Sequence, residues 1–268
     1  MTEATGFLQS VIAAKSAEVA AGREWRSVQE LREAVQYAAP PRGFRSALYD
    51  RLLEGRNAVV AEISRAAPGK GLLRDDFLPV ELARTLADAG ATCLSVATDR
   101  DFFQGSTRFL ERARDACPLP VLRRDYIIDS WQVYESRLIG SDAILLIAAI
   151  LDDMKLNEYA GLALELDLDV LMEVHDVDEL ERALVLPINM ISINCREVKP
   201  PSDELDATLE LAALVPEERI TIVDCDITER DVITRMNSAD INAFLLGETL
   251  MRCKNPAEKY QELFGSQI

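Results

Sequence analysis

Histidine is almost absent from this chain, since His175 is the only one among 268 residues. A metal site built from several histidines is therefore excluded, and a catalytic triad would have to use His175 itself. Cysteine is also sparse: the five residues are widely spaced and form no C-x-x-C pair. This usage predicts free thiols in a reducing, cytoplasmic compartment, without a disulfide framework or a zinc site.

Long apolar runs and clustered positive charge are missing too. No stretch of the sequence approaches the roughly 20 apolar residues that cross a bilayer, so we expect no membrane association. The N-terminus shows no basic-then-apolar pattern, so we expect no secretory signal. A net charge of -17 argues against binding of nucleic acid, which needs clustered Lys and Arg. An anionic substrate would have to be attracted by a local cationic pocket.

The glycine-rich turn G-x-G-x-x-G, typical of a doubly wound dinucleotide-binding sheet, does not occur. What recurs instead is an apolar run that ends in polar residues. The first is VVAEISRAAPGKG at residues 59–71, where Glu62 precedes a Pro/Gly loop. A (β/α)₈ barrel presents its catalytic groups in this way, at the carboxyl ends of its strands.

The spacing of these runs predicts eight strand–helix units. We place the strands at residues 58–63, 93–97, 120–123, 143–147, 169–173, 190–194, 220–223 and 243–246. Helical patterns fill every gap, which predicts a single α/β domain, a (β/α)₈ TIM barrel. Residues 1–55 read as a helical extension that lies over the barrel as a lid, and residues 56–268 as the barrel.

Charged and polar residues follow several predicted strands, and together they suit proton transfer and anion binding. Each of them alone is equally well explained as an ion pair or hydrogen bond of the barrel rim. His175 is more readily a structural loop residue than a catalyst. The turn FLLGETLMR holds either a phosphate or a plain strand-to-helix connection. The candidates are Glu62, Arg124, Glu173, Asn194, Arg196, Asp224, Asp226, Gly247 and Glu248.

Over nearly its full length the chain resembles the indole-3-glycerol-phosphate synthase family, the decarboxylating, ring-closing lyases of tryptophan biosynthesis. The resemblance rests on the blocks VVAEISRAAPGKGLLR, AGATCLSVATDRDFFQGS, LPVLRRDYIIDSWQVYESRLIG, LDLDVLMEVHDVDELERAL, SINCREV and AFLLGETLMR. It implies a TIM barrel with an N-terminal helical extension, and an enzyme that uses neither a cofactor nor a metal.

The resemblance also implies roles for individual residues. Glu62 and Glu173 match the family's catalytic glutamates, and Asn194 and Arg196 match its substrate-binding asparagine and arginine. Arg124 stands where the family's general-acid lysine is, in L-R-K-D-F, and is assigned a catalytic role. Gly247, Glu248 and three residues that depart from the family, Ser64, Cys225 and Asp226, are assigned to substrate binding.

Two of the departures, Ser64 and Asp226, make the substrate-binding region more negative than in the family. Ser64 replaces a substrate-binding lysine of E-I-K-K-A-S-P-S-K-G, and Ala67 replaces a serine of the same loop. Cys225 and Asp226 replace the serine and glycine of S-E-S-G-I, where the glycine N–H faces the substrate phosphate. A like-charge contact at about 4 Å costs on the order of 4 kcal/mol at an effective dielectric near 20. The expected consequence is weaker binding of a phosphate.

Three functions remain open from the sequence. The first is a diverged lyase that acts on an N-aryl amino-ketose with altered substrate or reduced phosphate binding. The second is indole-3-glycerol-phosphate synthase activity itself, with Lys70 reaching in as a replacement cation. The third is a catalytically silent paralogue with a binding or regulatory role, which would show a cavity filled by side chains. The expected partner is a small-molecule substrate, and the expected assembly is a monomer or homodimer.

Overall fold

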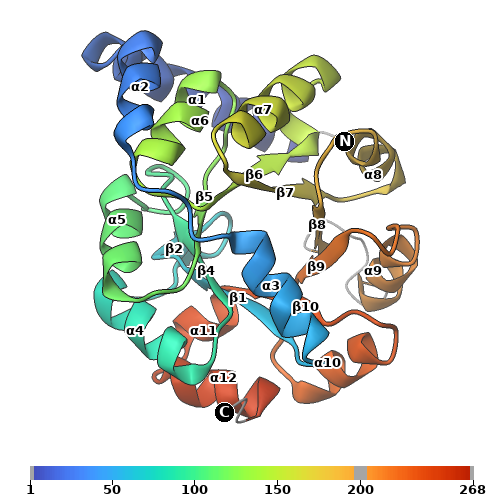
Figure 1. Cartoon of the computed structure of the whole chain (residues 1–268). Helices are drawn as coiled ribbons and strands as arrows, with labels where there is room; N and C mark the ends of the chain where they lie inside the picture. Colours follow the sequence, from blue (N-terminus) through green and yellow to red (C-terminus); the bar gives the residue numbers. More distant parts are fainter. Residues whose placement is uncertain (1–2, 196–203, 266–268) are drawn as a thin grey trace.

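The computed structural model describes residues 3–195 and 204–265. Eight strands form a closed barrel in the order β1-β10-β9-β8-β7-β6-β5-β4, and each strand pairs in parallel with its neighbours (Figure 1). This confirms the predicted (β/α)₈ TIM barrel. Every strand lies within one residue of its predicted bounds. The strands are β1 Ala58–Ile63, β4 Cys93–Ala97, β5 Val121–Arg124, β6 Ala143–Ile147, β7 Asp169–Val174, β8 Met190–Asn194, β9 Ile220–Asp224 and β10 Ala243–Leu246.

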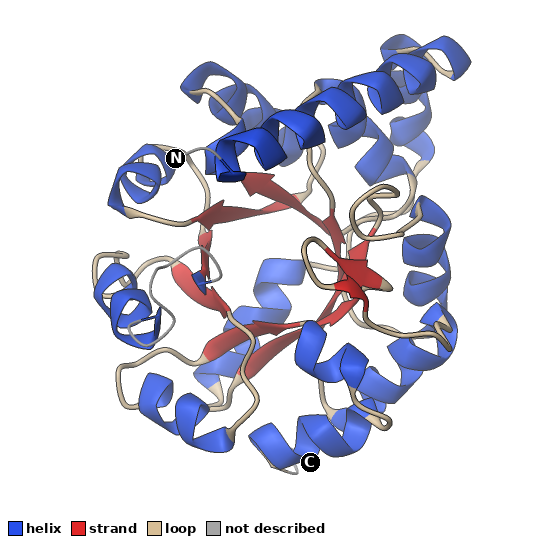
Figure 2. Cartoon of the chain, turned by 180° about the vertical axis from the view of Figure 1, so that it is seen from behind, coloured by secondary structure: helices blue, strands red, loops and turns tan. Residues whose placement is uncertain are grey.

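Helices surround the barrel on the outside (Figure 2). They are α4 Pro79–Ala89, α5 Thr107–Ala116, α6 Ser130–Leu138, α7 Asp153–Glu165, α8 Val177–Leu184, α9 Glu204–Ala212, α10 Arg230–Asn237, α11 Glu248–Arg252 and α12 Pro256–Phe264. Side chains at Ser106, Asp129, Asp152 and Asp176 accept a backbone N–H of the first turn, which fixes where four of them begin. The short strands β2 Ala66–Ala67 and β3 Gly71–Leu72 and the 3₁₀ turn η2 Ala148–Ile150 were not predicted.

The N-terminal helices do not lie together over one opening of the barrel. They are α1 Glu3–Trp25, α2 Val28–Ala34, the 3₁₀ turn η1 Val35–Tyr37, and α3 Phe44–Leu53. Figure 2 shows α1 lying along the upper edge of the barrel opening. In contrast, α3 lies at the end where the strands begin, because Arg45 N–H donates to Asp169, the first residue of β7 (2.8 Å). The prediction that the whole extension lies over the opening is therefore wrong for α3, whose Phe44 and Leu48 pack under the barrel interior.

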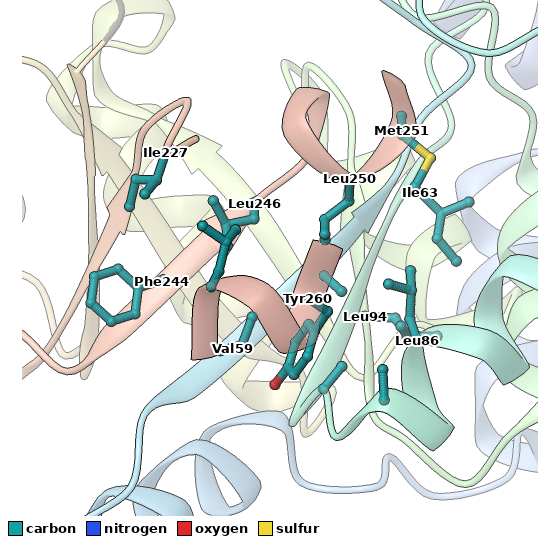
Figure 3. Close-up of a cluster of buried hydrophobic side chains, with 14 of the residues drawn as sticks. Val59, Ile63, Leu86, Leu94, Ile227, Phe244, Leu246, Leu250, Met251 and Tyr260 are labelled. Atoms are coloured by element: carbon teal, nitrogen blue, oxygen red, sulfur yellow. The ribbon is translucent and has the colours of Figure 1, made fainter. Parts of the chain in front are cut away.

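Alternation along each strand separates two layers of the core. Val59, Ile63 and Phe244 point outward to α4 and α12, where they pack with Leu86 and Tyr260 (Figure 3). The residues between them point inward, because successive strand side chains face opposite sides. Val60 thus belongs to the interior cluster, and Glu62 points into the barrel two residues later.

Candidate active site

The predicted catalytic residues converge where the barrel strands end. Glu62 lies at the end of β1, Arg124 at the end of β5, Glu173 near the end of β7 and Asn194 at the end of β8. All four are buried. Because every strand runs in the same direction, these ends meet at one rim of the barrel. Arg196 lies outside the described residues.

Arg124 is held by carboxylates on three sides. Its Nε lies 2.9 Å from Glu62 Oε2, its Nη2 lies 3.0 Å from Asp224 Oδ2, and its Nη1 lies 3.9 Å from Glu173 Oε2. Burial alone would lower the pKa of Arg124, but the three carboxylates outweigh burial and raise it. The guanidinium also lies 5.7 Å from the centre of the Phe103 ring. Arg124 is thus a fixed positive charge and a poor proton donor.

Glu173 is ionised and oriented by its neighbours. Asn194 Nδ2 donates to Glu173 Oε1 (3.1 Å), and His175 Nε2 lies 3.4 Å from the same oxygen. Burial would raise the pKa of Glu173, but the hydrogen bond from His175 and the charge of Arg124 outweigh it and hold the pKa at about 2. At neutral pH Glu173 is therefore a carboxylate.

His175 is charged and lies on the wall of the cavity. Its Nδ1 is 2.9 Å from Glu179 Oε2, and that same oxygen accepts the backbone N–H of His175. Burial would lower the pKa of His175, but its bonds to Glu173 and Glu179 raise the pKa to about 10. The sequence favoured a structural role for His175. The structure adds that its ring also contacts Glu173, a predicted catalytic residue.

A cavity of about 670 Å³ opens above these groups. Five predicted site residues line it: Arg124, Glu173, Asn194, Asp226 and Glu248. Lys70, which the sequence suggested as a replacement cation, lines it as well. Its remaining wall is mostly apolar or aromatic, with Phe7 and Leu8 contributed by α1. The other lining residues are Pro68, Gly69, Phe103, Asp125, Tyr126, Leu145, Ile147, Ala149 and His175.

Five predicted site residues lie off the cavity wall: Glu62, Ser64, Asp224, Cys225 and Gly247. Glu62 lies beside Arg124, and Gly247 packs against it, since a Cβ added at Gly247 would lie 2.9 Å from Glu62 Oε1. A larger residue at that position would displace the carboxylate of Glu62. Ser64 is fully buried just beyond β1, and its hydroxyl does not reach the cavity surface.

Asp226 and Glu248 place negative charge on the rim. Asp226 Oδ1 accepts a hydrogen bond from Thr249 Oγ1 (2.6 Å) at the start of α11. Glu248 is paired with Arg252 (2.6 Å) and with Lys70 (3.5 Å). The cation that the Pro/Gly loop supplies is therefore shared with a carboxylate before any substrate arrives.

Cys195 and Cys225 form a disulfide, so the prediction that all five cysteines are free thiols is wrong for this pair. Their Cα atoms lie 5.3 Å apart, across 30 residues of sequence. Cys195 follows Asn194, and Cys225 follows Asp224. Asn194 of β8 and Asp224 of β9 are register partners. The bond therefore ties together two strand ends of the site. Cys93, Cys117 and Cys253 are free.

We expect reduction of this disulfide to destabilise the fold. Closing a loop of this length restricts the unfolded chain by about 3–4 kcal/mol, so urea unfolding with dithiothreitol should have a lower midpoint than unfolding without it. The double variant Cys195→Ser/Cys225→Ser should match the reduced protein, and the half-buried Cys117→Ser serves as the control. Equal midpoints with and without the reductant would show that the bond does not stabilise the fold.

A buried charge cluster was not predicted. Lys15 of α1 is 1% exposed, and its Nζ lies 2.8 Å from both Asp99 Oδ2 and Asp125 Oδ1. Arg123 lies 3.0 Å from the other oxygen of Asp125. The sequence does carry a signal for this cluster, because Lys15 lies midway between two buried residues, Val11 and Val19, at helical spacing. The cluster fixes α1 over the opening.

Across residues 3–195 and 204–265, no group of three or more His, Cys, Asp and Glu side chains is arranged to hold a metal ion. Within the same ranges, no helix is both long and apolar enough to cross a bilayer.

Comparison with known proteins finds similarity over nearly the whole chain. The family model described as indole-3-glycerol phosphate synthase matches residues 8–263. Indole-3-glycerol phosphate synthase of Polaromonas naphthalenivorans is 46% identical, over 97% of this chain and 98% of that protein. The protein of the same name from Acidithiobacillus ferrooxidans is 45% identical, over 97% and 99%.

Among solved structures, the similarity shows the fold alone. Tryptophan synthase subunit alpha from Legionella pneumophila superposes with a TM-score of 0.62 at 13% identity, over 85% of this chain and 97% of that one. The 3-hexulose-6-phosphate synthase from Salmonella typhimurium gives a TM-score of 0.56 at 14% identity, over 77% and 96%.

Proposed function

This chain belongs to the indole-3-glycerol phosphate synthase family, and from that premise we propose that it catalyses the decarboxylating ring closure of 1-(2-carboxyphenylamino)-1-deoxyribulose 5-phosphate. The observation that carries the proposal is the contact of Arg124 with both Glu62 and Glu173 beside an open cavity. These are the positions to which the family resemblance assigns catalysis. The cavity is formed rather than filled, which favours an enzyme over a silent paralogue.

The reaction asks for charge stabilisation and for proton transfer. A ring carbon attacks the substrate's carbonyl carbon, and negative charge develops on the carbonyl oxygen. Arg124 supplies a fixed positive charge for that oxygen, which is the form of catalysis that pre-oriented charges perform well. Loss of CO₂ then restores the aromatic ring. Elimination of the hydroxyl as water requires a proton donor and a base, the roles proposed for Glu173 and Glu62.

The assay that tests this function follows formation of the indole product from the phosphorylated substrate. We expect measurable turnover, which Glu173→Gln should reduce by about 10²-fold or more, because general acid–base catalysis is typically worth 10² to 10⁴. The exposed Glu181→Gln on α8 provides a control of equal charge change. A wild-type protein without turnover would contradict the proposed function.

A second candidate is the same ring closure on a substrate without the phosphate. Asp226 favours it, because its carboxylate lines the cavity where the resemblance puts a phosphate-facing glycine. The dephosphorylated substrate, tested in parallel, decides between the two. A higher kcat/KM for the dephosphorylated compound, with Asp226→Asn reversing the order, would support this candidate over the first.

A further inference from the structure

The proposed ring closure consumes protons overall. The carbonyl oxygen takes one proton when the carbon–carbon bond forms and a second when it leaves as water. The methylene carbon returns one proton as the double bond forms, and CO₂ leaves the ring without giving one. Starting from the ionised carboxylate, each turnover therefore takes up one proton from outside the substrate.

Arg124 does not meet this demand. The family resemblance puts a general-acid lysine at this position, but a guanidinium does not release its proton in a protein. The carboxylate of Glu173 is ionised, so it too must be supplied with a proton before it can donate one. A protonated side chain in contact with Glu173 would be such a source.

His175 is that side chain. Its Nε2 faces Glu173 Oε1 at 3.4 Å, and its Nδ1 faces Glu179 Oε2 at 2.9 Å. Glu179 belongs to α8, which lies on the outside of the barrel, and its side chain is 15% exposed. The backbone N–H of His175 donates to the same Glu179 oxygen (2.9 Å), which fixes the ring between the two carboxylates.

We propose that Glu179, His175 and Glu173 form a relay that carries the consumed proton from solvent to the reacting oxygen. The inference rests on the proposed function. His175 Nε2 gives its proton to Glu173, and Glu173 passes it to the substrate oxygen. The neutral ring keeps its Nδ1 proton, so it turns over to bring Nε2 to Glu179, and Nε2 takes a new proton from solvent by way of Glu179. The relay enters the site from the side of α8, so it stays open when the substrate fills the cavity and keeps water out. His175 and Glu179 act through Glu173 and are relay residues.

The test is the effect of His175→Gln in two backgrounds, wild type and Arg124→Lys. Glutamine keeps a polar side chain but does not relay a proton. In the wild-type background we expect kcat to fall about 100-fold with little change in KM, because that is the lower range of general acid–base catalysis. In the Arg124→Lys background the ammonium supplies the proton, so the same substitution should cost less than about 10-fold.

Chemical rescue gives a readout that a structural role would not move. Imidazole added to His175→Ala should restore part of the lost kcat, whereas the exposed Glu181→Gln should behave as wild type. Glu179→Gln should lower kcat in the same direction as His175→Gln. An equal loss from His175→Gln in both backgrounds, or no loss in an active enzyme, would overturn the relay alone. A wild-type protein without turnover would remove the proposed function and the relay with it.

Discussion

Replacing Arg124 by lysine is expected to raise kcat for the ring closure about 10²-fold. Both side chains place a positive charge among the carboxylates of Glu62, Glu173 and Asp224. Only the ammonium can give up a proton, and general acid catalysis is typically worth 10² to 10⁴. Steady-state kinetics with the phosphorylated substrate measures the change, and KM should move little because the charge is kept.

Arg124→Met separates the two contributions of this side chain. Methionine removes the charge, so we expect turnover below detection together with a loss of about 3–5 kcal/mol in the free energy of unfolding, as when one partner of a buried ion pair is removed. The exposed Arg100→Lys serves as the matched control for the lysine variant. If Arg124→Lys lowered kcat instead, the simultaneous contact of the guanidinium with three carboxylates would be the catalytic requirement.

Lys15→Met is expected to cost about 3–5 kcal/mol of unfolding free energy, because it leaves two buried aspartates without their shared cation. The affected carboxylates are those of Asp99 and Asp125, each 2.8 Å from Lys15 Nζ. Burial would raise the pKa of Asp125, but Arg123 and Lys15 outweigh it and lower that pKa to about 2. Urea unfolding at neutral pH measures the loss.

The same substitution should weaken substrate binding more than it slows chemistry. Lys15 fixes α1, and α1 supplies Phe7 and Leu8 to the cavity wall. We therefore expect KM to rise with a smaller change in kcat. Lys155→Met, on the outer helix α7, is the control, because Lys155 is only half-buried and does not line the cavity. A Lys15→Met protein as stable as wild type would show that the cluster does not hold α1.

The barrel fold and its candidate catalytic residues follow from local sequence patterns. Alternation along β1 sends Glu62 inward whatever the rest of the chain does, and the same holds for Glu173 on β7. Parallel strands of a closed barrel then bring both ends to one rim. The family resemblance implied catalytic roles for the two glutamates, and the structure places both of them beside Arg124.

Other features depend on contacts between distant parts of the chain. Cys195 and Cys225 meet because β8 and β9 are neighbours in register, and their spacing in sequence carries no such information. The charge of His175, in contrast, depends on Glu173 and Glu179, which lie two and four residues away in the sequence. The opposite placement of α1 and α3 depends on which end of the barrel each helix packs against.

The sequence by itself determined the barrel, the strand ends and the identity of the groups that point inward, because the period of a strand acts within a few residues. Only the tertiary structure decided which distant groups touch: Arg124 with three carboxylates, and Lys15 with two aspartates. Charge–charge contacts and a disulfide act over a few ångströms in space, and the closed sheet sets which residues come that close.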